Sequence, residues 1–103
     1  MPPLADVAVA VKSANAGASW MTFDIVFDNR ATYERVRDSV RLDAGLFARV
    51  YAVDLSLVRV YYCDPVLTIK ATIPRTTSSG GVDETDFDGV QQFVPLLAVD
   101  VPG

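Results

Sequence analysis

The apolar residues of this chain change their spacing twice, and this change constrains the fold more than any other feature. From Trp20 to Asp28 apolar and polar residues alternate, which is the period of a half-buried strand. Between Arg30 and Arg41 the apolar residues recur at helical spacing, with charged residues filling the other side. Alternation returns in LVRVYYC and LTIKATI. The sequence therefore predicts helices between two groups of strands, which is an α+β arrangement.

The expected elements follow from this pattern. We expect strands at residues 6–11, 20–28, 57–63, 67–73 and 95–101, and helices at 30–41 and after Asp43. Asp28 or Asn29 is placed to cap the first helix and Asp43 the second, because their side chains can accept from the free amides of a first turn. The predicted fold is a single α+β domain with a mostly antiparallel or mixed sheet of about five strands and two helices packed on one face. The strand order stays open.

The length of the chain and one polar segment set its domain organisation. Residues 1–103 are the size of a typical single domain. Residues 75–89 are rich in Thr, Ser, Gly and acidic residues, which predicts a long acidic loop. Loops of about fifteen residues in compact domains are usually functional or disordered.

Charge and composition exclude several classes of function. The net charge of −4 argues against binding to nucleic acid, which favours basic surfaces. Histidine is absent and Cys63 is the single cysteine, so the chain has no Ser-His-Asp triad, no imidazole zinc site and no internal disulfide. We expect no cofactor. Whether the chain is an enzyme stays open, and catalysis by the chain alone is the least favoured interpretation.

The apolar residues do not predict a membrane segment. The longest apolar runs are far shorter than the roughly 18 residues needed to cross a bilayer. The start, MPPLADVAVAVK, lacks the basic region and apolar core of a signal peptide, so we expect a cytoplasmic location. The mean hydropathy of +0.26 is high for a small acidic domain. This predicts apolar surface that is covered by a partner, either another chain or further copies of this one.

Three stretches together resemble a known family: KSANAGASWMTFDIVF, IKATIPR and DFDGVQQFVPLL. They are similar to a small family of unknown function found beside, or fused to the C-terminus of, the acyclic terpene utilisation protein AtuA and its relatives. The resemblance covers nearly the whole chain. It implies a small subunit, or a detached C-terminal domain, of an AtuA-like assembly encoded near genes of acyl-CoA and branched-chain acid metabolism. The relatives carry a histidine after the paired glutamines, where this chain has Phe93, so any role of that imidazole is absent here.

Asn15 and Gly17 form the first candidate site. Glycine-containing loops can present backbone amides to a carboxylate or phosphate. The alternative is an ordinary turn, in which glycine permits a positive φ and asparagine tolerates it. Composition favours the turn, whereas the resemblance raises the weight of a binding role.

Lys70 and Arg75 form the second candidate site. With Pro74 holding the chain extended, they could be a cationic pair for an anionic ligand or for a carboxylate of a partner. Alternatively, Lys70 is an exposed strand lysine that discourages edge pairing. Asp24 shares a strand face with Asp28 at about 13 Å, too far for a paired acid and base on one bond. We expect Asp24 to face solvent or an interface.

Gln91 and Gln92 are the last candidates. Their amides can bind a polar group of a ligand or satisfy neighbouring backbone. The nearby acidic residues of DETDFDG imitate the first half of a calcium loop, but Pro95 stands where the twelfth ligand belongs. We therefore expect no metal site.

These features predict a small accessory or site-completing subunit of an AtuA-like complex that acts on small organic acids or acyl-CoA esters. Its partners would be the large AtuA-like protein, further copies of this chain, or both. The alternative is a self-assembling binding module for an anionic metabolite. The candidate ligand- or partner-binding residues are Asn15, Gly17, Asp24, Lys70, Arg75, Gln91 and Gln92.

Overall fold

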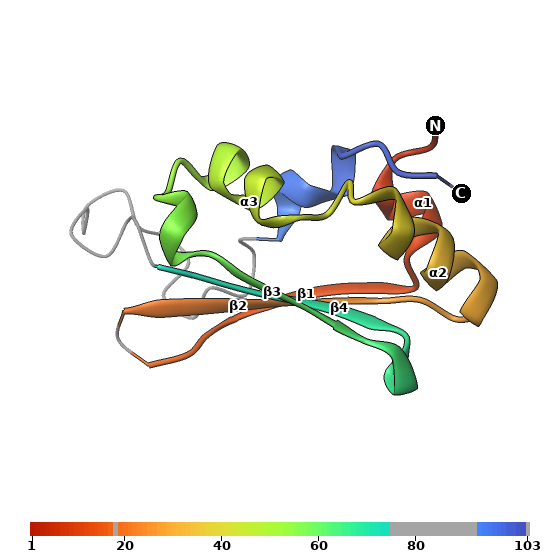
Figure 1. Cartoon of the computed structure of the whole chain (residues 1–103), viewed down its shortest axis with the longest axis horizontal. Coiled ribbons are helices and arrows are strands. Elements are labelled where there is room, and N and C mark those ends of the chain that lie inside the picture. Colours follow the sequence, from red (N-terminus) through yellow and green to blue (C-terminus); the bar gives the residue numbers. More distant parts are fainter. Residues whose placement is uncertain (18, 75–92, 103) are drawn as a thin grey trace.

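The computed structural model describes residues 1–17, 19–74 and 93–102, which form one antiparallel sheet with the helices on one side of it (Figure 1). In chain order the elements are α1 (Leu4–Val7), β1 (Ala10–Asn15), β2 (Trp20–Val26), α2 (Arg30–Ser39), α3 (Ala44–Tyr51), η1 (Leu55–Leu57), β3 (Arg59–Cys63), η2 (Asp64–Val66), β4 (Thr68–Pro74) and η4 (Val94–Ala98).

The sheet has the strand order β1-β2-β4-β3, and every neighbouring pair is antiparallel. β1 and β2 form a hairpin, β3 and β4 are joined through η2, and the two helices are inserted between these pairs. The α+β class and the packing of both helices on one face are confirmed (Figure 1). The described residues form four strands in place of the expected five.

Alternation along the inner strands gives the sheet one buried face. Phe23, Ile25 and Ile69 point into the core and are fully buried, as the period of β2 predicts. Phe23 contacts two aromatic rings of α3, with centroid distances of 5.8 Å to Phe47 and 5.0 Å to Tyr51. These aromatic contacts hold α3 on the sheet.

Both helices begin at the predicted caps. The side chain of Asn29 accepts from the Thr32 amide at 2.8 Å, and that of Asp43 accepts from the Leu46 amide at 2.9 Å. The first helix ends earlier than predicted, at Ser39 instead of residue 41. Val40, expected in its apolar stripe, lies one residue beyond α2 in the left-handed region (φ 57°) and is 57% exposed.

The N-terminal elements differ from the expectation. The strand expected at residues 6–11 lies further along the chain: Leu4–Val7 form α1, and β1 runs from Ala10 to Asn15. The small residues of SAN continue the strand, in which Ser13 pairs with Phe23 in the register and is buried. Leu4 of α1 fills the core instead of the valines that follow it.

The prediction of a last strand at residues 95–101 is wrong. The segment is a 3-10 helix, η4, followed by a single bridge between Pro3 and Asp100. Pro95 has no amide to donate to a ladder and suits a first helical turn. Leu96 then becomes the buried residue of the segment. The acidic loop expected at 75–89 lies outside the described residues.

The two ends of the described chain are hydrogen-bonded to each other on the helical side of the sheet (Figure 1). The amide of Leu4 donates to Val99 at 2.7 Å, and that of Val101 donates to Pro2 at 2.9 Å. No helix among the described residues has the length and apolar character needed to span a membrane.

Candidate functional site

The face of the sheet turned away from the helices carries two rows of side chains that cross all four strands. We call it the open face, and its central rows are Lys12, Asp24, Lys70 and Tyr61, and beside them Ala14, Thr22, Thr72 and Arg59. Trp20 lies on the same face at the end of β2. Because α1, α2, α3 and η4 all pack on the other side, none of them covers these rows (Figure 1).

The first row is organised around one carboxylate. Asp24 accepts from Lys70 Nζ at 2.7 Å, and the two side chains are 38% and 49% exposed. This hydrogen bond to Asp24 raises the pKa of the Lys70 ammonium. Lys12 lies on the other side of Asp24 in the register and makes no ion pair within the described part of the chain. One carboxylate thus stands between two lysines.

The open face is electrically unlike the chain as a whole. Its described strand residues carry three cations, Lys12, Lys70 and Arg59, against the single carboxylate of Asp24, a net charge of plus two. The whole chain has a net charge of −4. A concentration of one sign on one surface attracts ligands or partners of the other sign. The open face is therefore suited to anions.

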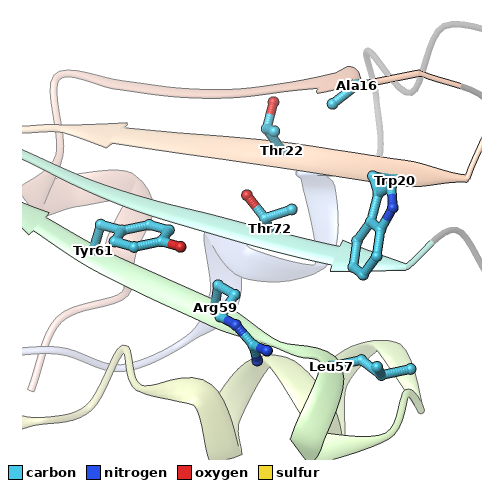
Figure 2. Close-up of a pocket in the computed structure, with 7 residues that line it drawn as sticks. All are labelled: Ala16, Trp20, Thr22, Leu57, Arg59, Tyr61 and Thr72. Atoms are coloured by element: carbon cyan, nitrogen blue, oxygen red, sulfur yellow. The ribbon is translucent and has the colours of Figure 1, made fainter.

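A groove of about 510 Å³ lies at the end of the open face where Trp20 stands. Figure 2 shows the indole of Trp20 at one end of it and the ring of Tyr61 at the other, with the Tyr61 hydroxyl directed toward Thr72 and Arg59. The residues that line it come from the β1–β2 hairpin, η1 and three strands, and they are Ala16, Trp20, Thr22, Leu57, Arg59, Tyr61 and Thr72. A smaller hollow of about 210 Å³ lies beside it against Lys12 and Asp24.

Arg59 is the charged group of this groove. Its Nη1 donates to two backbone carbonyls, those of Ser56 at 2.8 Å and Val58 at 3.1 Å. These bonds fix the guanidinium beside the start of β3 and leave the Nε and Nη2 donors without a partner among residues 1–17, 19–74 and 93–102. No described carboxylate pairs with Arg59. The groove thus presents a positioned cation that the described chain does not neutralise.

The structure brings only some of the predicted site residues together. Asp24 and Lys70, predicted separately, form one ion pair. Asn15 is the half-buried last residue of β1 opposite Met21, and Gly17 is exposed in the following turn with φ 80°. The amide between them, that of Ala16, donates to the Trp20 carbonyl at 2.8 Å and closes the hairpin. Arg75, Gln91 and Gln92 lie outside the described residues.

Sequence reasoning missed Arg59 and Trp20 as site residues. The alternation of LVRVYYC puts Arg59 and Tyr61 on one strand face, and this is the signal that was available. That they share a face with Trp20 depends on the strand order, which the sequence left open. Tyr62 lies on the other side of β3, where its hydroxyl donates to the Leu42 carbonyl at 3.3 Å.

A cluster of perturbed titratable groups lies away from the open face. Burial, together with a short hydrogen bond to Asp64, raises the pKa of Tyr33 to about 12. The same hydrogen bond, followed by the Arg37 guanidinium at 3.2 Å, holds the pKa of Asp64 below its usual range. Arg37 also lies over the Tyr33 ring, 5.6 Å from its centroid. This cluster fastens α2 to η2, which is a structural role.

Two further observations bear on the chemistry. No group of three or more Cys, Asp or Glu side chains in the described ranges is placed to hold a metal ion. Phe93 is half-buried and packs against the core. The Phe93 side chain makes an apolar contact and has no group that could transfer a proton.

The described residues define a small one-sided α+β domain, with its helices on one face of the sheet and a net positive charge on the strand residues of the other. The chain belongs to the DUF4387 family, a domain of unknown function, and the family model matches residues 4–100. Neither the curated proteins nor the solved structures contain a match to it. The predicted membership of a family of unknown function is confirmed, and the association with AtuA stays a prediction.

Proposed function

We propose that this protein is a small accessory or site-completing subunit of an AtuA-like complex that acts on small organic acids or acyl-CoA esters. In this proposal the open face docks on the large AtuA-like protein in the cytoplasm. The observation that carries it is the net positive charge of the open face in a chain of net charge −4. A surface of this kind suits the acidic surface of a partner or the acidic groups of a bound substrate.

The groups on this face favour binding and orientation over catalysis by this chain alone. Asp24 is held by Lys70 at 2.7 Å, so it is not placed as one member of a pair of carboxylates that exchange a proton. Lysine, arginine, threonine and tyrosine side chains supply hydrogen-bond donors to an anion. The subunit would therefore contribute donors to a shared site, while the partner supplies the reacting groups.

Charge reversal on the open face tests the docking surface. Lys12→Glu removes an exposed cation of the open face that makes no ion pair with a described residue. The matched control is Arg35→Glu, an exposed reversal on α2, on the opposite side of the sheet. After co-expression with an AtuA-like protein, we expect a mixed complex for the unaltered chain and for Arg35→Glu. Lys12→Glu should lose that complex at physiological salt, as judged by native mass.

Two results would contradict the proposal. Equal complex formation by Lys12→Glu and Arg35→Glu would remove the open face from the interface. A tight homo-oligomer that ignores the AtuA-like protein would remove the partner, and would favour the alternative of a self-assembling binding module for an anionic metabolite. The groove on the open face is the observation that favours this second function.

A further inference from the structure

We infer that the groove between Trp20 and Tyr61 binds a small carboxylate with a short apolar body, and that Arg59 receives the carboxylate. The inference deepens the proposed role of the open face, on which it rests, by naming the ligand class and the residues that select it. Neither Arg59 nor Trp20 was a candidate on sequence grounds.

The size and lining of the groove set the body of the ligand. About 510 Å³ lies within the range of roughly 300–1,000 Å³ that is typical of small-molecule sites. Trp20, Leu57 and Ala16 contribute apolar surface at one end, where the indole lies across the end of β4 (Figure 2). Trp20 is 39% exposed, so an apolar body lying against its ring would remove that surface from water.

The donors of the groove set the charge of the ligand. The Nε and Nη2 groups of Arg59, the Thr72 hydroxyl and the Tyr61 hydroxyl make no hydrogen bond within the described ranges. Figure 2 shows the Tyr61 hydroxyl directed toward Thr72 and Arg59, while the Arg59 guanidinium is turned toward η1, where it donates to the Ser56 carbonyl. The three side chains thus line the same part of the groove. An arginine fixed by two backbone carbonyls is preorganised for a carboxylate, because its side chain is already ordered before binding. A neutral ligand would leave this charge without a counter-charge.

The single tryptophan of the chain provides a direct measurement. Because Trp20 is the only tryptophan and lines the groove, its fluorescence, excited selectively over that of the tyrosines, reports on the surroundings of this residue. The purified full chain is titrated with phenylacetate and with hexanoate, and in parallel with phenylacetamide and hexanamide. Each amide has nearly the shape of its acid but no charge. We expect saturable fluorescence changes with the acids, and binding of the amides weaker by roughly tenfold or more, as for the loss of a hydrogen bond to a charged group.

Variants then locate the carboxylate. Arg59→Gln should weaken binding of the acids by roughly tenfold or more while leaving the weak binding of the amides unchanged. Arg41→Gln, an exposed arginine between the helices, is the matched control and should change neither. Thr72→Val, which keeps the shape of the side chain, is the second test in case Arg59→Gln disturbs η1. It should weaken acid binding by a smaller factor and leave the far-UV circular dichroism unchanged.

Three outcomes would overturn the inference. No saturable response to either acid at millimolar concentration means that the groove does not bind this class. Equal affinity for acids and amides means that the groove is apolar only. Loss of acid binding in Lys70→Met but not in Arg59→Gln moves the anion to the row of Lys12, Asp24 and Lys70. Because every measurement uses the chain alone, failure here is distinct from failure to form the AtuA-like complex.

Discussion

Asp64 ties α2 to the turn between β3 and β4, although the two segments are about thirty residues apart. Tyr33 donates its hydroxyl to the Asp64 carboxylate, Arg37 donates to the same oxygen at 3.2 Å, and Arg30 reaches the Asp64 carbonyl at 3.5 Å. Tyr33 is fully buried, so its hydroxyl needs a partner, and Asp64 supplies it. The adjacent Pro65 fits the first turn of η2.

Replacement of Asp64 by asparagine should lower stability in a pH-dependent way. The folded-state pKa of Asp64 is held below its unfolded value, so its contribution is present above about pH 4 and is lost as the pH falls through the lower folded-state pKa. We therefore expect Asp64→Asn to unfold at lower urea concentration than the unaltered chain at pH 7, and the difference to shrink well below pH 4. Urea titrations at both pH values measure this.

Asp38→Asn is the matched control for that experiment. Asp38 is exposed and pairs only with its neighbour Arg37 among the described residues, so its removal should change stability little at either pH. A difference between Asp64→Asn and the unaltered chain that stays constant with pH would show that the charge of Asp64 is not what stabilises the contact.

At the scale of elements, both helices end on residues in the left-handed region. Val40 closes α2 with φ 57° and Ala52 closes α3 with φ 56°. Glycine is the residue that adopts this conformation at no steric cost, and a β-branched residue adopts it least readily. The sequence signals for the helix starts were therefore strong and those for the helix ends were absent.

Val40→Gly should stabilise the protein. The substitution removes the strain of a β-branched residue in the left-handed region, which is worth about 1 kcal/mol. Because Val40 is exposed, loss of its side chain removes little packing from the core. Chemical denaturation should show a higher midpoint with an unchanged slope. Arg35→Gly, inside α2, is the control and should destabilise by about 1 kcal/mol. A lower midpoint for Val40→Gly would mean that the valine contributes packing.

The elements that local pattern predicts well are those in which local and tertiary preferences agree. The apolar and polar residues of β2 alternate, as is typical of a strand with one buried face, and β2 is such a strand in the structure. Asn29 and Asp43 cap the two helices, as predicted from their side chains. The ends of the chain were mispredicted because tertiary packing decided them: Leu4 and Leu96 are drawn into the core as helical residues, whereas their neighbours also suit strands.

The candidate site was predictable only in part, for a related reason. Asp24 and Lys70 stood out as charges within apolar strands, but that they touch depends on the register of β2 with β4. Arg59 joins them on one face only because β4 lies between β2 and β3. Strand order depends on contacts between distant segments, and no local pattern in this chain encodes it.

At the scale of the whole molecule, the core and the proposed binding surface lie on opposite sides of one sheet. The core lies between the sheet and α2 and α3, where Phe23 and Phe47 are fully buried with their ring centroids 5.8 Å apart. On the other side Tyr61 is 54% exposed and makes no hydrogen bond with a described residue. Changes on the two sides should therefore have different effects.

Truncation of an aromatic residue on each side measures this asymmetry. Phe47→Ala should reduce the free energy of unfolding by about 3–5 kcal/mol, a large fraction of the roughly 5–15 kcal/mol of a typical domain. Tyr61→Ala should change it by no more than about 0.5 kcal/mol, as for an exposed residue without packing partners. Thermal unfolding of both variants is the measurement. A large loss of stability for Tyr61→Ala would mean that the open face is covered in the isolated chain.

The hydrogen bonds that join the two ends of the chain have a consequence for protein engineering. Because Leu4 pairs with Val99 and Val101 with Pro2, a short linker between the ends would make a ring without stretching the backbone. A circular permutant with new ends in the β1–β2 turn at Gly17, an exposed position, should keep the same four strands. A protein fused to either original end would extend from the helical side of the sheet, so it would not cover the open face (Figure 1).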